Sequence, residues 1–543
     1  MLGIMMDKQL NIADILEYAA QYNTDAEIVT RQVEGGIHRY SYREALQRTK
    51  KLANALQALG VQQGDRIATL AWNTYRHFEI YYAVSGMGAV THTINPRLFA
   101  EQIIYIINHA EDQYVFVDLT FVPLLEAVKD HIPVVKGFVV MTDRAHMPAS
   151  SLPNLLCYED LIAPHSEEFA WPEFDEKTAA GLCYTSGTTG NPKGVMYSHR
   201  STVIHAVSAC RSSALNLGPL SRVLPVVPMF HVCAWGIPYS APIAGSSIIF
   251  PGAGMDGASL YELIDGEKAS ALLGVPTVWL GLLNYIESIK GNLDTVENVV
   301  IGGSAAPRSM MEKFQDVYGV FPIHAWGMTE MSPMGSLCAK TPYLMKADKE
   351  GRARVQSKQG RAVFGVEMKI VDDQDRALPH DGKTFGKLMV RGPWVASGYY
   401  KNDDRSAFRG GWFDTGDVSS IDPDGYMQIV DRSKDVIKSG GEWISSIELE
   451  NHAVGHQAVA EACVVGVAHP KWDERPLLLI VRKPGVQCSK EDIISFLGDK
   501  VAKWWIPDDV VFVDALPHTA TGKLLKTEVR EKFARHYLDM TSA

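Results

Sequence analysis

The first half of the chain alternates short runs of β-branched and other apolar residues with segments of helical periodicity. Residues 66–72, for example, have the pattern of a strand, and a helix-like segment at 76–86 follows after a turn. Because this alternation is typical of parallel strands joined by helices, it predicts an α/β fold whose ligands bind at the carboxyl ends of the strands. Further strands of this kind are expected at 113–118, 137–142, 182–185, 246–250 and 296–301.

The second half changes character. From about 360 to 430, strand-like stretches separated by turns replace the helical periodicity, which predicts an antiparallel, barrel-like subdomain. A small α+β unit begins after Asp431 and Arg432. With 543 residues the chain exceeds one typical domain of roughly 100–200 residues. We therefore predict a large N-terminal domain of α/β subdomains, 1–431, and a small, mobile C-terminal domain, 432–543.

Within the C-terminal unit, helices are expected near 446–454 and 490–502, and strands near 461–467 and 477–482. No internal repeat and no low-complexity tract is visible in the chain.

Composition argues against several classes of protein. The formal net charge is −11 and no basic stripe is visible, which argues against a partner made of nucleic acid. The seven cysteines are scattered, as expected for reduced thiols in a cytoplasmic protein without structural zinc. Asp7 and Lys8 interrupt the apolar N-terminus, so no signal peptide is predicted. The uncharged stretch 223–255 contains five prolines, which argue against a transmembrane helix.

The stretch YTSGTTGNPKG, residues 184–194, gathers glycines and hydroxyl side chains around Lys193. Glycine lets backbone N–H groups converge on an anion, and the hydroxyls and the ammonium add further donors. A Walker A loop has Ser or Thr directly after its lysine, whereas Gly194 follows Lys193, so that class of nucleotide site is excluded. The stretch therefore predicts a loop that holds a polyphosphate; the alternative is a turn-rich surface loop.

A second glycine pattern, GAGMDG at 252–257, matches the dinucleotide-binding fingerprint GxGxxG. The strand expected next, near 269–275, does not end in the Asp or Glu that would bind a ribose hydroxyl. A nicotinamide-dependent dehydrogenase is therefore not the expected class.

Several later stretches follow the glycine-rich loop along the chain: PMFHVCAWG (228–236), GVPTVW (274–279), GGSAAPR (302–308), HAWGMTEMSP (324–333), GWFDTGD (411–417), DRSKDVIKSGGEWIS (431–445) and LPHTATGK (516–523). Together with the loop, and in this order, they resemble the signature of the adenylate-forming superfamily. This superfamily contains acyl-CoA synthetases, luciferases and the adenylation domains of peptide synthetases. The chain is most similar to bacterial medium- and long-chain fatty acyl-CoA synthetases and to ligases that activate 3-methylthiopropionate.

The resemblance implies a two-step reaction with ATP, Mg²⁺, CoA and a small-molecule carboxylic acid. ATP and the acid give acyl-AMP and pyrophosphate, and the CoA thiol then displaces AMP. Two anions must approach each other in the first step, so positive charge has to be in place beforehand. Lys523 matches the lysine that bridges the carboxylate and the α-phosphate. An exposed tail lysine is the alternative.

For the phosphates, the resemblance implies that Lys193 grips the leaving pyrophosphate and that Thr329 faces the α-phosphate. Glu330 and the Thr185 hydroxyl match the usual Mg²⁺ ligands, which are hard oxygens. A helix-capping carboxylate is the alternative for Glu330. The loop residues implied to hold the β- and γ-phosphates are Thr185, Ser186, Gly187, Thr188, Thr189, Gly190 and Lys193.

For the nucleoside, Asp417 and Arg432 match the residues that bind the ribose hydroxyls, although an ordinary turn Asp with a surface Arg is the alternative. Trp326 stands where many relatives have a tyrosine that stacks on adenine, and an indole also offers a flat π face. The other residues implied to border the nucleotide and the acyl group are Gly302, Gly303, Ser304, Ala305, Ala306, Gly327 and Met328.

Two side chains of the uncharged stretch match acyl-side residues: His231 next to the carboxylate, and Trp235 as a gate on an apolar tunnel. A buried histidine and a core tryptophan are the alternatives. Lys434 matches the hinge about which the small domain rotates between the two half-reactions. After this rotation, the residues implied to contact the nucleotide or border the pantetheine channel are Lys438, Ser439, Gly440, Gly441, Glu442 and Trp443.

The leading hypothesis is a cytoplasmic acyl-CoA synthetase acting on a medium- to long-chain fatty acid. A ligase for a short thioether acid such as 3-methylthiopropionate is the alternative with the same mechanism. A carrier-loading, acyl-AMP-forming module is a different class, and it is disfavoured because the glycine turn on the CoA side is intact. A luciferase-like oxidative enzyme is less favoured still. Relatives are often homodimers, but no interface signal is visible in the sequence.

Overall fold

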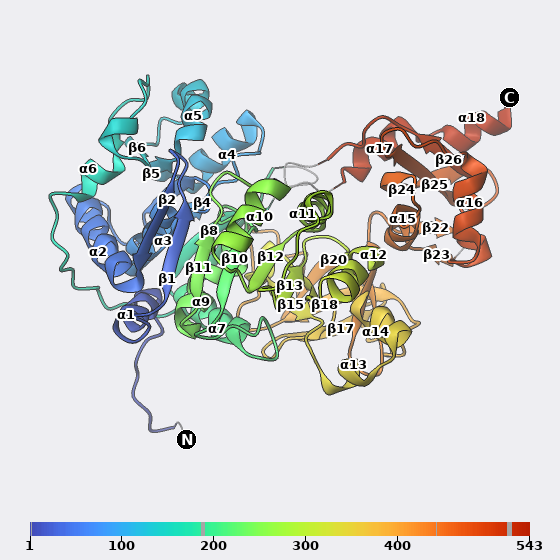
Figure 1. Cartoon of the computed structure of the whole chain (residues 1–543), viewed down its shortest axis with the longest axis horizontal. Helices are drawn as coiled ribbons and strands as arrows, with labels where there is room; N and C mark the ends of the chain where they lie inside the picture. The colour runs from blue at the N-terminus through green and yellow to red at the C-terminus, as the bar shows by residue number, and fades with distance from the viewer. Residues whose placement is uncertain (2, 186–190, 441, 519–523, 543) are drawn as a thin grey trace.

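The computed structural model describes residues 1, 3–185, 191–440, 442–518 and 524–542, and it consists of a large N-terminal part and a smaller C-terminal lobe (Figure 1). The first sheet of the large part has seven strands in the order β7-β6-β5-β3-β4-β8-β9. Only the last pair, β8 and β9, is antiparallel. Its strands are β3 (Arg66–Leu70), β4 (Val90–Thr93), β5 (Asp112–Val117), β6 (Gly137–Val140), β7 (Leu155–Cys157), β8 (Ala179–Tyr184) and β9 (Gly194–Ser198). The helices between them along the chain are α3 (Tyr75–Gly86), α4 (Ala100–Ala110), α5 (Val122–Val128) and α6 (Tyr158–Ile162).

The second sheet has nine strands in the order β16-β15-β14-β13-β12-β10-β11-β1-β2, and its central strands are parallel. Its strands are β1 (Glu27–Arg31), β2 (Ile37–Ser41), β10 (Arg222–Pro225), β11 (Ser247–Phe250), β12 (Ala271–Gly274), β13 (Asn298–Ile301), β14 (Phe321–Gly327), β15 (Met334–Leu337) and β16 (Arg361–Ala362). The α/β prediction is thereby confirmed. The accompanying helices are α1 (Ile12–Tyr22), α2 (Tyr42–Ala58), α7 (His199–Cys210), α8 (Val232–Trp235), α9 (Ile237–Ala244), α10 (Gly257–Gly266), α11 (Pro276–Ile289), α12 (Arg308–Glu312), α13 (Pro342–Lys346) and α14 (Lys349–Gln356).

The segment expected to be antiparallel forms a third sheet of five strands. Strand β20 (Trp412–Ile421) is its centre and pairs with β18 (Gly386–Arg391), β19 (Phe408–Arg409) and β21 (Met427–Arg432); β17 (Glu367–Val371) pairs with β18. The strand pairings leave this sheet open among the described residues, with β17 at one end, so it is not a closed barrel there.

The C-terminal lobe carries a fourth, mainly antiparallel sheet. The two predicted helices begin where expected, at Ser446 and Lys490, but the second ends at Gly498, earlier than expected, and a short 3-10 turn at Lys503–Trp505 follows. Two further helices near the C-terminus were not predicted. Its strands are β22 (Ile437–Ser439), β23 (Glu442–Ile444), β24 (Val459–His469), β25 (Asp473–Arg482) and β26 (Asp509–Phe512). Its helices are α15 (Ser446–Val454), α16 (Lys490–Gly498), α17 (Lys526–Lys532) and α18 (His536–Ser542).

The glycines of GAGMDG are explained by packing. At Gly252, φ is +61° and a Cβ atom would lie 2.3 Å from the carbonyl oxygen of Arg31. A Cβ atom on Gly257, the first residue of α10, would lie 2.6 Å from the carbonyl oxygen of Gly281 on α11. The pattern therefore serves the contact between strands and helices at these positions.

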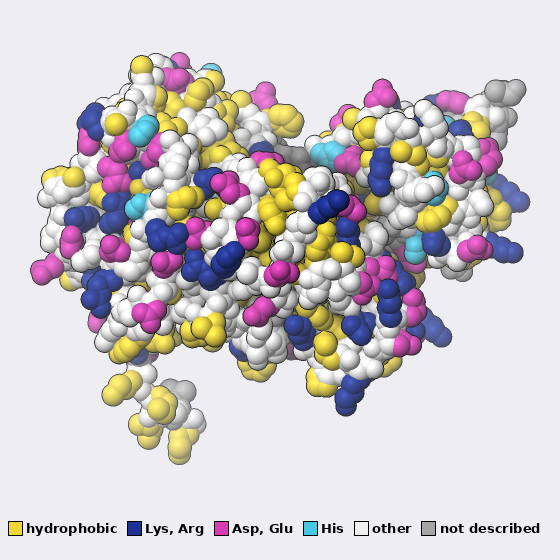
Figure 2. All heavy atoms as spheres, in the orientation of Figure 1, with side chains coloured by type: hydrophobic (Ala, Val, Ile, Leu, Met, Phe, Trp, Pro, Cys, Tyr) yellow, Lys and Arg dark blue, Asp and Glu magenta, His cyan; other side chains and the backbone are white. Residues whose placement is uncertain are grey.

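The uncharged stretch 223–255 folds into β10, α8, α9 and β11, with Pro242 inside α9. Among the described residues, no helix has both the length and the apolar character that crossing a membrane requires. On the face shown in Figure 2, acidic and basic side chains are intermingled.

Candidate functional site

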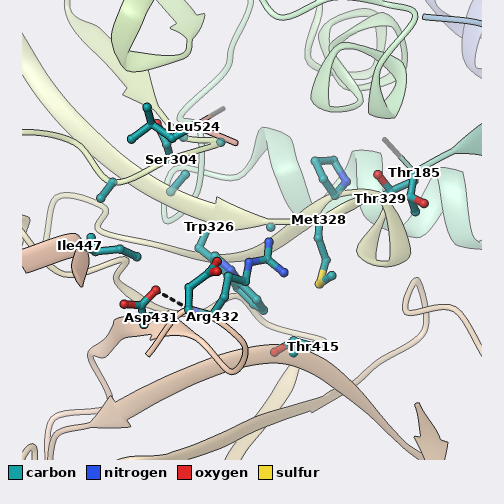
Figure 3. A pocket seen from close by; sticks show the side chains of 18 of the residues that line it. Thr185, Ser304, Trp326, Met328, Thr329, Thr415, Asp431, Arg432, Ile447 and Leu524 are labelled. Atoms are coloured by element: carbon teal, nitrogen blue, oxygen red, sulfur yellow. Dashed lines mark hydrogen bonds between the residues drawn. The ribbon is translucent and has the colours of Figure 1, made fainter. Parts of the chain in front are cut away.

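A cavity of about 940 Å³ lies at the carboxyl ends of the central strands, and residues of the C-terminal lobe also line it. In Figure 3, Thr185 and Thr329 lie together at one end, while Ser304, Leu524 and Ile447 lie toward the other. The predicted residues among its lining are Thr185, Lys193, His231, Trp235, Gly302, Gly303, Ser304, Ala305, Trp326, Gly327, Met328, Thr329, Glu330, Arg432 and Lys434.

The base of the glycine-rich loop is closed by two hydrogen bonds. Strand β8 ends at Tyr184, and the Thr185 N–H then donates to the Lys193 carbonyl over 2.9 Å. The Lys193 N–H donates to the Thr185 hydroxyl over 3.2 Å. Thr185, Asn191 and Lys193 all line the cavity. The predicted phosphate-binding residues Ser186, Gly187, Thr188, Thr189 and Gly190 lie outside the described residues.

A second loop, after β14, brings Thr329 and Glu330 to the same end of the cavity. Glu330 is 6% exposed, and its Oε1 accepts a hydrogen bond from the Tyr399 hydroxyl over 2.8 Å. The Lys193 Nζ lies 4.9 Å from the centroid of the Tyr399 ring. Glu330 is therefore held by a side chain rather than serving as a helix cap alone. Sequence reasoning missed Tyr399, since no spacing relates it to residues so far away in the chain.

The ribose pair predicted from sequence is present as a contact. Asp417 on β20 lies opposite Arg432 on β21, and the Arg432 Nε lies 2.9 Å from the Asp417 Oδ1. Asp417 is 1% exposed, which is unlike an ordinary turn Asp, whereas the Arg432 side chain is 43% exposed. The Trp326 indole N–H donates to the Asp417 Oδ2 over 3.0 Å. The edge of the Trp326 indole, where many relatives have a tyrosine, thus holds the buried Asp417 carboxylate.

The backbone of α8, which carries Trp235, is left-handed. The φ angles of Val232, Cys233, Ala234 and Trp235 lie between +46° and +55°, a region that costs each L-residue about 1–2 kcal/mol. A Cβ atom on Gly302 would lie 2.9 Å from the Trp235 ring, so the glycine leaves room for the indole. Sequence reasoning found Trp235 but not the strained turn, because the non-glycine residues carry no local signal for a positive φ.

Near the expected hinge, Lys434 and Asp435 line the cavity, and burial lowers the pKa of Lys434. The guanidinium of Arg530 on α17 donates to the Lys434 carbonyl over 3.1 Å. In contrast, Lys438, Ser439 and Gly440 are not part of the cavity lining.

The rest of the predicted CoA-side turn has two different outcomes. Gly441 lies outside the described residues, and Glu442 and Trp443 are described as residues of β23. Gly440 itself has φ of +59°, and a Cβ atom there would lie 2.9 Å from the Trp472 ring. The structure therefore does not bring Gly440 together with the end of the cavity that Thr185 and Thr329 line.

Sequence reasoning also missed a buried cluster next to Arg432. The Asp431 Oδ2 accepts a hydrogen bond from the Ser446 N–H, at the start of α15, over 2.9 Å. The Lys526 Nζ contacts the Ser446 hydroxyl and lies 2.8 Å from the Glu450 Oε1. Burial alone would lower the pKa of Lys526, but Glu450 and Asp431 outweigh it and raise this pKa. The cluster joins β21 to two helices of the C-terminal lobe.

The adenylation lysine predicted from sequence, Lys523, lies outside the described residues. The residues on either side of that gap, His518 and Leu524, line the cavity, as do Leu525 and Lys526. Both ends of this chain segment are thus at the cavity.

The chain resembles known proteins over nearly its whole length. A model of the AMP-binding enzyme family matches residues 16–400, and a model of the AMP-binding enzyme C-terminal domain matches residues 448–523. The 3-methylmercaptopropionyl-CoA ligase of Ruegeria lacuscaerulensis is 50% identical, covering 98% of this chain and 99% of that protein. The medium-chain-fatty-acid–CoA ligase of Ectopseudomonas oleovorans is 48% identical, covering 100% of both.

Among solved structures, the anthranilate CoA ligase AuaEII in complex with anthranoyl-AMP has a TM-score of 0.86 at 25% identity, covering 97% of this chain and 98% of that chain. This likeness confirms the predicted architecture of a large N-terminal and a small C-terminal domain. Together with the cavity between the two parts, these matches show that the chain belongs to the AMP-binding enzyme family.

Proposed function

We propose that the protein is an acyl-CoA ligase that activates a medium- to long-chain fatty acid as acyl-AMP and then transfers the acyl group to CoA. The observation that carries the proposal is that one cavity combines a polar end with an apolar wall. The polar end carries Lys193 and Glu330. The apolar lining residues include Leu215, Val300 and Leu337.

In the proposed first step, the polar end holds the triphosphate of ATP. Lys193 and the donors of its loop stabilise the charge of the departing pyrophosphate, and Thr329 faces the α-phosphate. The Asp417 carboxylate accepts hydrogen bonds from the ribose hydroxyls, oriented by Trp326 and Arg432. Such a site requires hydrogen-bond donors that are in place before the reaction starts. The two hydrogen bonds at the base of the loop support this arrangement.

The residues at the polar end also fit Mg²⁺. This ion prefers hard oxygen ligands and substrate phosphates, and the Glu330 carboxylate and Thr185 hydroxyl are such ligands at the same end of the cavity. When bound, Mg²⁺ would neutralise charge on the phosphates. The chain's own part is to present a carboxylate that Tyr399 already orients.

We assign Lys523 to the approach of the two anions in the first step. The support is that Leu524, its neighbour in sequence, lines the same cavity as Ser304 and Trp326. Because the glycine turn at Gly440 is outside that lining, we further propose that the lobe rotates about Lys434 to present this turn to CoA. The boundary between 431 and 432, a homodimer and a cytoplasmic location stay predictions.

The identity of the acid is best settled by a screen. Pyrophosphate release should be measured for straight-chain acids of three to eighteen carbons and for 3-methylthiopropionate, each with and without CoA. We expect the highest kcat/KM for a medium or long chain. A preference for 3-methylthiopropionate would favour the thioether alternative, which the identity to the Ruegeria protein also supports. Release of pyrophosphate with none of the acids would refute the proposed function.

We propose that Trp235 limits access to the apolar wall, and the strain of α8 supports this role. Replacing Trp235 by Ala should change the chain-length profile in the same screen. An unchanged profile would make Trp235 an ordinary packing residue.

A further inference from the structure

The two loops at the polar end come from different sheets. The loop that contains Lys193 joins β8 to β9 in the seven-stranded sheet, whereas Glu330 follows β14 in the nine-stranded sheet. The strand orders of these sheets do not share a strand among the described residues. The distance between Lys193 and Glu330 is therefore not fixed by strand pairing, and other contacts must set it.

Residues 396–400, which follow β18 of the third sheet, contact both loops. The Ala396 N–H donates to the Glu330 carbonyl over 2.7 Å, and the Tyr400 N–H donates to the Gly194 carbonyl over 2.8 Å. Tyr399 lies between Ala396 and Tyr400 in the sequence. One segment thus bridges the two loops.

The Tyr399 side chain touches both functional groups at once. Its hydroxyl donates to the Glu330 Oε1 over 2.8 Å, and its ring centroid lies 4.9 Å from the Lys193 Nζ. The ring itself packs against Phe408 at a centroid distance of 5.3 Å. Because the ring packs against Phe408 in addition to its contacts with Glu330 and Lys193, its position is defined.

The choice of a phenol has a chemical consequence. A hydroxyl orients a carboxylate without neutralising it, so the contact with Tyr399 leaves the negative charge of Glu330 in place. The face of an aromatic ring attracts an ammonium without being an anion, so it does not compete with phosphate for Lys193 as a carboxylate would. A direct ion pair between Lys193 and Glu330 would instead have to be broken whenever Mg²⁺ and pyrophosphate bind.

We propose that Tyr399 is a positioning residue that keeps Lys193 and Glu330 apart and aligned for the metal-bound pyrophosphate of ATP. This inference rests on the proposed function, because it assumes that the polar end holds Mg·ATP. Tyr399 acts through the two side chains that it holds and does not itself react.

The test compares Tyr399→Phe with Tyr399→Leu. Phenylalanine keeps the ring next to Lys193 and loses only the hydroxyl. We expect it to raise the Mg²⁺ concentration for half-maximal pyrophosphate release by about tenfold, as for a lost hydrogen bond to a charged group, with the KM for ATP little changed at saturating Mg²⁺. Leucine loses both contacts and should raise the KM for ATP as well. Thioester formation from supplied acyl-AMP, in which no pyrophosphate takes part, should be unchanged in both variants.

A binding measurement does not depend on finding the acid. Mn²⁺ binding to the full-length enzyme with a non-hydrolysable ATP analogue, followed by electron paramagnetic resonance, should weaken in Tyr399→Phe by the same factor. If the acid screen failed while this shift remained, only the proposed chemistry would be lost. If the unaltered enzyme did not bind Mn²⁺ with the analogue, both proposals would be overturned.

A matched control exists in Tyr158, whose hydroxyl donates to the Glu79 Oε2 over 2.6 Å in the interior, away from the cavity lining. Tyr158→Phe should lower the melting temperature and leave the Mg²⁺ dependence as it is. Wild-type Mg²⁺ dependence and Mn²⁺ binding in Tyr399→Phe would overturn the positioning role. So would a Tyr399→Leu variant that loses both half-reactions equally.

Discussion

The predicted phosphate end of the cavity, which Lys193 and Glu330 line, and the predicted hinge end, which Lys434 and Asp435 line, are held together by different kinds of contact. At the phosphate end, Tyr399 connects Lys193 with Glu330 through a neutral hydroxyl and an aromatic face. At the hinge end, Asp431 on β21 is connected to Ser446 and Lys526 of the C-terminal lobe by buried charges and hydrogen bonds.

The difference matches what each end has to do in the proposed reaction. The phosphate end lies within the large domain, and its loops can keep their positions throughout both steps. The contacts of Asp431 cross the predicted domain boundary, so rotation about Lys434 would have to rearrange them. We therefore predict one fixed wall, which carries Tyr399, and one movable wall, which carries Asp431, around the same nucleotide.

Lys523→Ala should separate the two half-reactions most strongly. We expect adenylation to fall by about 10²- to 10³-fold, as when one charge-stabilising donor is removed, because no other group would bridge the two anions. Thioester formation from supplied acyl-AMP should be largely kept. Single-turnover assays of each half-reaction measure the ratio, and an equal loss in both would contradict a role confined to the movable wall.

Lys526→Met tests the movable wall itself. The variant leaves the largely buried Glu450 without its cation and removes a positive charge near Asp431. Breaking a buried ion pair typically costs about 3 kcal/mol or more. We expect a less stable C-terminal lobe and adenylation lowered by about tenfold. A tenfold loss corresponds to only part of the free energy of the broken ion pair. A matched control is Lys490→Met, which breaks an ion pair with Asp509 inside the lobe.

The role of Lys526 in the movable wall would be contradicted if Lys526→Met and Lys490→Met lowered adenylation and thioester formation in the same proportion. Urea unfolding followed by a probe in the C-terminal lobe separates the loss of stability from the loss of adenylation.

Trp326→Phe tests the hydrogen bond between Trp326 and Asp417. It keeps a flat ring beside the nucleotide but removes the N–H that holds Asp417. We expect the KM for ATP to rise by about three- to tenfold with kcat little changed, in line with the loss of one hydrogen bond. Steady-state kinetics at saturating Mg²⁺ measure it. A change in the Mg²⁺ dependence instead would mean that the fixed wall extends to Trp326.

Ala234→Gly should have the smallest effect and the opposite sign. Glycine adopts positive φ without a Cβ penalty, so the left-handed turn should become more stable by about 1 kcal/mol. Thermal unfolding measures this gain. Ala206→Gly on α7 is the matched control and should destabilise by a similar amount, since glycine weakens a right-handed helix. A loss of stability in Ala234→Gly would contradict the strain.

The predicted elements and the observed ones agree best where the signal is local. The alternation of apolar runs and helical periodicity predicts parallel strands because each strand and helix is patterned over a few residues. The same reasoning extended the helix after Lys490 too far, because the residues after Gly498 have no periodicity that separates a helix end from the turn that follows. No sequence pattern indicated that Asp431, on β21, contacts the C-terminal lobe.

The sequence by itself determined the α/β class, and the motif order pointed to Glu330, Asp417 and Arg432. The polyphosphate character of the loop around Lys193 stays a prediction. The α/β class follows from residue types at short spacing, where backbone geometry leaves few alternatives. The motif residues follow from the resemblance to the adenylate-forming superfamily. Only the tertiary structure decided that Tyr399 joins Lys193 to Glu330, that Trp326 holds Asp417, and that Ser446 links Asp431 to Lys526. Those contacts depend on how separate sheets and helices pack, and no spacing along the chain encodes that arrangement.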